Sequence, residues 1–155
     1  MPSATIQEQM PSSAAQVFAL LHDYSRRLEW DTLLCEARLT RGHQQAGPGA
    51  TSLCVGKPWF GLIGIETRYV TFKPGEIAAV EMINRPPFFD HFAASIRHQD
   101  NEHGSMAVYK FQFTARPRCL RWLLHPIMLP QLRRETHKRL QALASFLART
   151  SNRPV

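Results

Sequence analysis

The C-terminal part of the chain decides the fold, and it begins where residues 105–115 read SMAVYKFQFTA. Small and aromatic residues alternate there with polar ones, the period-2 pattern of a strand with one buried face. From Leu129 to Leu147 the period changes, and apolar residues recur every three or four positions, which predicts one face of an amphipathic helix. Pro126 and Pro130 predict a break that separates this helix from a short helical stretch at residues 120–125.

Before the strand at residues 105–115, short runs of strand-forming residues are separated by Gly, Pro and polar turn residues. The predicted strands cover residues 4–10, 33–41, 51–55, 62–72, 77–83 and 89–98. A serine before residues 14–21 predicts a capped helix, and residues 24–30 suit a second short one. The sequence therefore predicts an α+β fold: a curved antiparallel sheet of about six to seven strands, covered by the long C-terminal helix.

Length and composition favour one domain over residues 1–150, followed by a flexible tail at 151–155, because the 155 residues are 44% apolar and 20% charged. No apolar run reaches the roughly 18 residues of a membrane span, and no secretory signal is visible, so we expect a cytoplasmic protein. The three cysteines are widely spaced and odd in number, which favours reduced, mostly buried thiols over disulfides or zinc.

The positive charge is concentrated at the C-terminal end. Residues 1–115 hold 10 Lys and Arg against 11 Asp and Glu, whereas residues 116–155 hold 9 against 1, so net charges of −1 and +8 sum to +7. One interpretation is a solvated helix face; another is an anionic membrane surface that binds Arg133, Arg134, Lys138 and Arg139. Nucleic acid is not expected, because interleaved aromatics and Gly-rich spacers are missing.

Local motifs support a family resemblance. Residues 11–24 read PSSAAQVFALLHDY and are followed by Glu29-Trp30-Asp31; a GPGAT loop stands at 47–51 and PPF at 86–88. In this order they resemble the START-like or Bet v 1-like superfamily, the polyketide cyclase/dehydrase and lipid-transport group. The resemblance implies a helix-grip fold with a deep apolar cavity between sheet and helix, which takes a lipid, sterol, polyketide or quinone. It also implies no metal and no cofactor.

The predicted cavity wall and mouth consist of aromatic and apolar side chains with few polar anchors, among them the Tyr109 hydroxyl. The ligand-binding candidates are Trp30, Trp59, Phe60, Tyr69, Phe88, Phe92, Ile96, Tyr109, Phe111, Phe113, Leu132, Thr136 and Leu140. Ordinary core packing, or rim packing for the tryptophans, is the alternative, because a cavity and a core need the same pattern.

Three functions remain open. The first is binding or transfer of a hydrophobic small molecule by a monomer or homodimer. The second is a polyketide cyclase or dehydratase that uses acid–base residues in the cavity, with Glu66, Arg68, Glu81 and His91 as candidates. An exposed strand position is the alternative for His91, and the sequence contains no nucleophile elbow, zinc motif or phosphate loop. The third is an interaction module that uses the basic helix face.

Overall fold

A computed structural model describes residues 1–58 and 61–151. Its sheet has seven antiparallel strands in the order β1-β7-β6-β5-β4-β3-β2. The strands are β1 (Ser3–Met10), β2 (Leu34–Thr40), β3 (Thr51–Gly56), β4 (Gly64–Lys73), β5 (Ile77–Met82), β6 (Phe89–Asn101) and β7 (Gly104–Ala115). The helices are α1 (Ala14–Leu21), α2 (Arg27–Trp30), the 3-10 helix η2 (Arg118–Leu120) and α3 (Arg121–Ser151).

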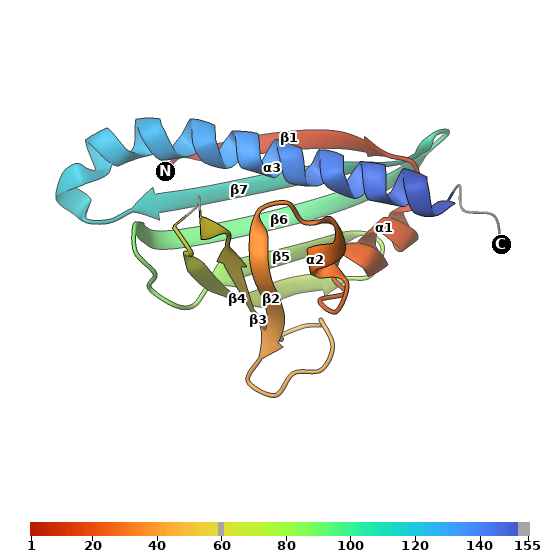
Figure 1. Ribbon diagram of the computed structural model, residues 1–155, viewed down its shortest axis with the longest axis horizontal. Helices are drawn as coiled ribbons and strands as arrows, with labels where there is room; N and C mark the ends of the chain where they lie inside the picture. The colour runs from red at the N-terminus through yellow and green to blue at the C-terminus, as the bar shows by residue number, and fades with distance from the viewer. Residues whose placement is uncertain (59–60, 152–155) are drawn as a thin grey trace.

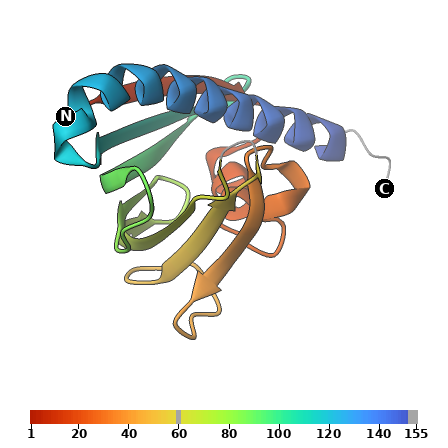
Figure 2. The ribbon, with the colours of Figure 1, turned by 60° about the vertical axis from the view of Figure 1, so that its left-hand side comes forward.

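Helix α3 lies along β1 and β7 and covers one face of the sheet, while α1 and α2 lie between β1 and β2 in the chain and close one end (Figure 1). The strands curve away beneath α3, so that β2, β3 and β4 lie farthest from it (Figure 2). A curved sheet that grips one long helix is the helix-grip fold, and the predicted architecture is confirmed.

The core lies where the two C-terminal periodicities meet. On β7 the alternating residues Ala107, Phe111 and Phe113 are buried, and on α3 the helical stripe buries Leu143 and Leu147. Each of these large apolar side chains stabilises the fold by about 1.5–3 kcal/mol relative to an exposed position. The strand alternation and the helix stripe that the sequence predicts therefore face each other.

The predicted break in the last helix is wrong, because α3 runs without interruption through Pro126 and Pro130. Each proline removes only one N–H donor, and a spacing of four residues puts both on the same side of the helix. Both lie on the outer part of the helix and are not buried, so water reaches the carbonyl groups that lose their partners. Ser151, predicted as the first residue of a flexible tail, belongs to α3 instead, and residues 152–155 lie outside the described residues.

A helix cap and a tight hairpin fix the local structure at two places. Ser13 caps α1, since its hydroxyl accepts a hydrogen bond from the Gln16 backbone N–H at 3.3 Å, as the sequence predicts. The β6–β7 hairpin is tighter than predicted, because β6 continues to Asn101 and only two residues form the turn. Gly104 follows that turn with a φ of +133°, and a Cβ there would collide with the Met10 carbonyl oxygen.

We therefore expect Gly104→Ala to lower the free energy of unfolding by about 3 kcal/mol, from backbone strain and from the collision with β1. Gly42 is the matched control, because its φ of +78° is also positive but a Cβ there would meet no atom within 4 Å. Gly42→Ala should cost only about 1 kcal/mol in chemical denaturation. Equal losses in the two variants would show that the contact with β1 is unimportant.

Candidate functional site

A cavity of about 150 Å³ lies between the sheet and the three helices α1, α2 and α3. Its apolar wall includes Phe92 and Ile96 of β6, Phe111 of β7 and Leu132 of α3. The Phe92 and Phe111 rings are stacked, with centroids 6.3 Å apart and planes inclined at 18°. Small residues such as Ala94 also line the wall, so the space between the larger side chains is not filled.

One end of the cavity carries a chain of hydrogen-bonded polar side chains. The Tyr69 hydroxyl lies 2.7 Å from His22 Nδ1 and 2.9 Å from the Tyr24 hydroxyl. Tyr24 in turn donates to Ser52 Oγ at 3.0 Å, and Ser52 Oγ lies 3.2 Å from Thr67 Oγ1. All five side chains line the cavity.

The donors in this chain follow from His22 and Tyr24. Burial, followed by the charges of Arg27 and His98, lowers the pKa of His22 to about 3, so His22 is neutral near pH 7. Tyr24 has one proton and donates it to Ser52, so Tyr69 must donate to Tyr24. His22 Nδ1 must then carry the proton that it donates to Tyr69, and its Nε2 is a buried acceptor without a partner among the described residues.

An ion triad stands beside the hydrogen-bonded chain. Asp31 Oδ2 accepts from Arg27 Nε at 2.9 Å and from Arg139 Nη2 at 2.9 Å, and Asp31 Oδ1 accepts from Arg139 Nε at 3.0 Å. Burial opposes ionisation of Asp31, but the charges of Arg139 and Arg27 together lower its pKa to about 2. Both arginines line the cavity, whereas Asp31 lies behind them.

Two further hydroxyl groups in the wall have no hydrogen-bond partner in the described part of the chain. They belong to Tyr109 of β7 and Thr136 of α3, and both residues line the cavity together with Arg139. Burial raises the pKa of Tyr109, and the nearby Arg139 partly opposes that rise. The cavity therefore combines an apolar wall with donor groups that are free to bind an oxygen atom.

The residues predicted to bind a ligand divide into three groups by their place in the structure. Those that line the cavity are Tyr69, Phe92, Ile96, Tyr109, Phe111, Leu132 and Thr136. Trp30, Phe113 and Leu140 are buried in the core instead, and Phe88 is 52% exposed at the surface, so these four do not line the cavity. Trp59 and Phe60 lie outside the described residues.

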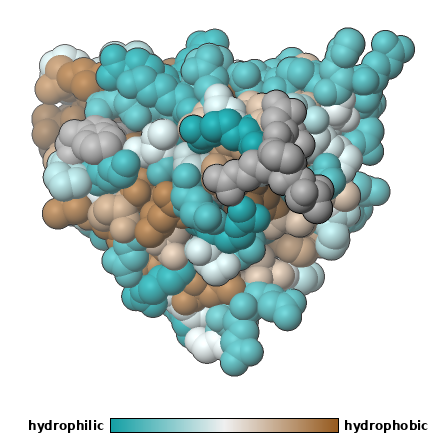
Figure 3. Space-filling view, turned by 45° about the vertical axis from the view of Figure 1, so that its right-hand side comes forward, coloured by the Kyte–Doolittle hydropathy of each residue, from teal (hydrophilic) through white to brown (hydrophobic). Residues whose placement is uncertain are grey.

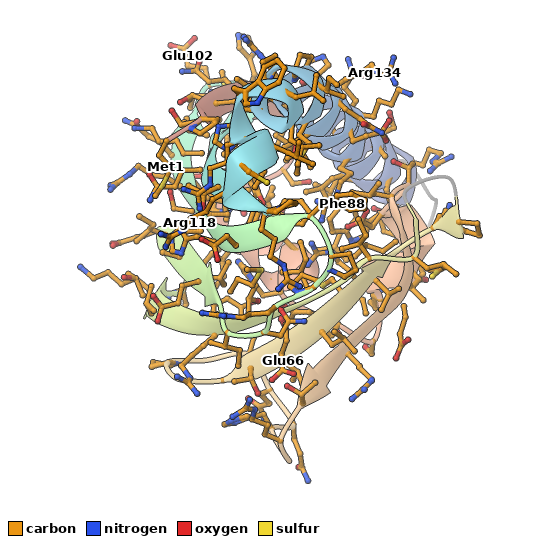
Figure 4. All side chains as sticks on the ribbon, turned by 90° about the vertical axis from the view of Figure 1, so that its left-hand side faces the viewer. Met1, Glu66, Phe88, Glu102, Arg118 and Arg134 are labelled. Carbon is orange, nitrogen blue, oxygen red and sulfur yellow. The ribbon has the colours of Figure 1, made fainter. Side chains whose placement is uncertain are left out.

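None of the four catalytic candidates lines the cavity, which corrects their predicted role. On β4 the residues Ile65, Thr67 and Tyr69 face the cavity, so the alternation of side chains points Glu66 and Arg68 to the opposite face. Figure 4 shows Glu66 in the part of the sheet far from α3, and its carboxylate pairs with Arg41 at 2.9 Å. Arg68 and Glu81 are exposed and face each other across β4 and β5, and His91 is half-buried on β6.

The sequence analysis missed the residues that form the polar end, although a signal exists for some of them. Arg139 follows Thr136 by three positions and therefore falls on the buried stripe of α3. The membrane-facing role predicted for Arg139 is wrong, because its guanidinium binds Asp31. Arg133, Arg134 and Lys138 are exposed on the outer face of α3, where Figure 4 labels Arg134.

The cysteines are unpaired, and the prediction that they are mostly buried is wrong. Cys35 and Cys119 are exposed, and Cys54 lines the cavity, where burial raises the pKa of its thiol. Within residues 1–58 and 61–151, no group of three or more His, Cys, Asp or Glu side chains is arranged to hold a metal ion. No helix in that part of the chain has an apolar stretch long enough to cross a bilayer.

Fold and site together define a helix-grip protein with a cavity between its sheet and its helices. Residues 1–147 match the family model described as polyketide cyclase / dehydrase and lipid transport. The chain belongs to that family, which confirms the resemblance seen in its sequence. No curated protein sequence matches it.

Solved structures with this fold include two single-domain proteins and one di-domain protein. ZhuI aromatase/cyclase from Streptomyces sp. R1128 is 13% identical with a TM-score of 0.79, over 97% of this chain and 96% of its own. TTHA0849 from Thermus thermophilus is 11% identical with a TM-score of 0.82, over 97% of this chain and 100% of its own. The di-domain ARO/CYC StfQ of the steffimycin pathway is 10% identical with a TM-score of 0.78, over 97% of this chain and 52% of its own. At these identities the likeness shows a shared fold.

His98 lies outside the cavity lining and predicts a pH dependence of stability. It is 6% exposed, neither ring nitrogen has a partner among the described residues, and burial lowers its pKa from 6.5 to about 4. Between these values the unfolded chain binds a proton that the folded chain does not. Stability should therefore fall as the pH drops from 6.5 to 4, by up to about 3 kcal/mol from this group.

The test is chemical denaturation of the wild type and of His98→Phe from about pH 4 to about pH 7. The variant should keep its stability at neutral pH, because no hydrogen bond is lost, and should show a shallower decline on acidification. The residual decline belongs in part to His22, whose pKa is also lowered. Identical slopes for the two proteins would show that His98 does not resist protonation.

Proposed function

We propose that the protein binds a compact, hydrophobic, ring-containing molecule that carries at least one oxygen acceptor. The observation that carries this proposal is the pair of hydroxyl groups on Tyr109 and Thr136, which line an otherwise apolar wall without a partner among the described residues. A ligand oxygen at this place gains a hydrogen bond, which contributes about 0.5–1.5 kcal/mol net, whereas a pure hydrocarbon gains none.

The size of the cavity favours a ring-sized ligand. A dry cavity of about 150 Å³ in another protein holds benzene, and the cavity here has the same volume, about 150 Å³. The stacked rings of Phe92 and Phe111 offer a flat aromatic surface for such a ligand. These dimensions support an aromatic or polyketide-like ligand over a sterol or a long-chain lipid.

A cyclase or dehydratase activity is the second candidate, and the hydrogen bond between His22 and Tyr69 favours it. His22 donates to the Tyr69 hydroxyl and orients it at the cavity wall, as acid–base catalysis requires. The family description and the ZhuI aromatase/cyclase fold support this candidate. Binding is the stronger proposal, because no carboxylate lines the described cavity and a His22 with a pKa of about 3 is a weak base.

The test compares naphthol with methylnaphthalene, two probes of similar shape that differ in the oxygen atom. We expect Tyr109→Phe and Thr136→Val each to weaken naphthol binding about 3–10-fold, because each removes one hydrogen bond at nearly constant volume. Binding of methylnaphthalene should be unchanged, and isothermal titration calorimetry measures both. Conversion of a polyketide-like substrate that stops in Tyr69→Phe would favour the enzyme instead.

Native mass spectrometry of the gently purified protein, followed by solvent extraction, is the complementary measurement. A co-purified aromatic molecule would support the proposed function directly. A co-purified sterol or long-chain lipid would contradict the size argument. Failure of both naphthol and methylnaphthalene to bind would contradict the proposed function itself.

A further inference from the structure

The polar end of the cavity carries one positive charge that no described residue neutralises. Arg27 and Arg139 line the cavity, and Asp31 is the carboxylate that both of them contact. Exposed fractions of the three side chains are 11%, 18% and 0%, so the whole group is withdrawn from bulk water. Two guanidinium groups and one carboxylate leave a net charge of +1.

Asp31 has no further capacity to accept. Its Oδ1 takes hydrogen bonds from Arg139 Nε at 3.0 Å and from the Leu33 backbone N–H at 3.1 Å. Its Oδ2 takes one from Arg27 Nε at 2.9 Å and one from Arg139 Nη2 at 2.9 Å. The four lone-pair positions of a carboxylate are therefore occupied.

The arginines, in contrast, keep free donors. Arg27 Nη1 donates to the Leu21 carbonyl oxygen at 3.2 Å, but Arg27 Nη2 and Arg139 Nη1 have no partner in the described part of the chain. The hydroxyl groups of Tyr109 and Thr136, which line the same cavity, also have no hydrogen-bond partner among the described residues. The cavity therefore gathers donor groups and positive charge at one end.

No other acidic group in the described residues compensates this charge from a neighbouring element. Glu135 precedes Thr136 on α3 and is buried, but it does not line the cavity, and its carboxylate lies 3.7 Å from Lys138 Nζ and 4.0 Å from Arg134 Nε. None of the described cavity-lining residues is Asp or Glu. An uncompensated charge in a dry site is costly, and a bound anion relieves that cost.

We propose that the ligand is an anion: a compact aromatic molecule with a carboxylate that binds Arg139 and Arg27 and accepts from Tyr109 or Thr136. This inference rests on the proposed function and names the chemical class of its ligand. A planar guanidinium suits a carboxylate, because two parallel N–H groups match its two oxygens. The rings then lie against Phe92 and Phe111 in the apolar part of the cavity.

Naphthoate and naphthamide test this proposal, because they have the same shape and only naphthoate is charged. We expect the wild type to bind naphthoate at least about tenfold more tightly in calorimetry at neutral pH, as charge-assisted hydrogen bonds allow. Arg139→Gln should remove most of this preference and leave naphthamide binding nearly unchanged. Arg139→Lys keeps the charge without the planar fork and should give an intermediate preference.

The outcomes separate this proposal from the proposed function. Equal binding of the two probes by the wild type, or a preference for naphthamide, would overturn the anionic ligand and leave hydrophobic binding intact. Failure of both probes to bind would contradict the proposed function as well. If Arg139→Gln fails to fold, the comparison of naphthoate with naphthamide binding by the wild type still tests the anionic ligand.

A different surface carries a second, independent inference. At the start of α3 one side of the helix is apolar and exposed, with Trp122 at 75%, Leu123 at 44% and Ile127 at 58% exposure. At about 100° per residue these three positions, together with Pro126 and Pro130, fall within one sector of about 140°. Figure 3 shows brown apolar atoms at the upper left, the end of the molecule where α3 begins.

Nearby side chains extend the patch and give it charge. Leu120 is 41% exposed and Phe88 is 52% exposed, and Figure 4 labels Phe88 and Arg118 on opposite sides of the start of α3. Arg121 pairs with Asp90 at 2.7 Å, whereas Arg118 is exposed without an acidic partner among the described residues. Farther along α3, hydrophilic side chains cover the top of the molecule in Figure 3.

We infer that this end of α3 docks on an anionic phospholipid surface. Arg118 at this end and Arg133, Arg134 and Lys138 farther along α3 are exposed, so a second copy of the chain would bring positive charge against positive charge, whereas an anionic bilayer is complementary. Tryptophan and aliphatic side chains flanked by arginine are typical of segments that lie in a membrane interface.

Vesicle co-sedimentation tests this inference with pure phosphatidylcholine and with a phosphatidylcholine–phosphatidylserine mixture. The wild type should bind the mixed vesicles, and salt should weaken that binding. Trp122→Ala combined with Ile127→Ala should reduce it at least about tenfold. Val70→Ala is the control, because Val70 is 54% exposed on β4 and should leave binding unchanged.

Equal loss of binding in the control and the double variant would overturn the docking surface. Absence of vesicle binding by the wild type would do the same. A dimer in solution that the double variant abolishes, without any vesicle binding, would also overturn it and would identify the patch as a contact between two copies.

Discussion

The carboxylate of Asp31 joins the beginning of the molecule to its end, and the cavity depends on that contact. Asp31 follows α2, and Arg139 is 108 residues farther along the chain on α3, yet three hydrogen bonds connect the two side chains. Arg27 completes the group from the other side. The long helix is thereby held over the α2 end of the sheet by directional bonds, and the apolar stripe of α3 supplies the remaining attraction along β1 and β7.

This arrangement explains how a protein of modest size can keep a space in its core. Ala78, Ala94 and Gly56 line the cavity at positions where larger side chains would fill it. The polar groups at its end are mostly satisfied by one another, from His22 to Thr67, which offsets the cost of burying them. The exceptions, the free donors of Arg27 and Arg139 and the hydroxyls of Tyr109 and Thr136 among the described residues, indicate what the cavity is built to receive.

The cavity combines features of both leading hypotheses. A carrier for apolar molecules needs an apolar lining, and an enzyme of this fold needs titratable groups inside the cavity. The apolar wall of β6, β7 and α3 meets the first condition, and His22, Arg27 and Arg139 meet the second. These titratable groups come from α2, α3 and the segment after α1, whereas the sequence analysis sought them on the strands. An oxygen-bearing aromatic ligand suits both parts of the lining.

The amino-acid sequence by itself determined the strands along the chain, the helix from Leu129 to Leu147 and the aromatic face of β7, because periods of two and of about 3.6 residues are local properties. Seven of the predicted ligand-binding residues, from Tyr69 to Thr136, line the cavity, but the periods alone could not separate a cavity wall from ordinary core. Only the tertiary structure decided that Arg139 turns inward and Glu66 outward. Arg139 bonds to Asp31, which is 108 residues away in the sequence, and both faces of β4 mix apolar with polar residues. In both cases the orientation of the side chain depends on how the sheet curves around α3, and a local sequence pattern does not contain that information.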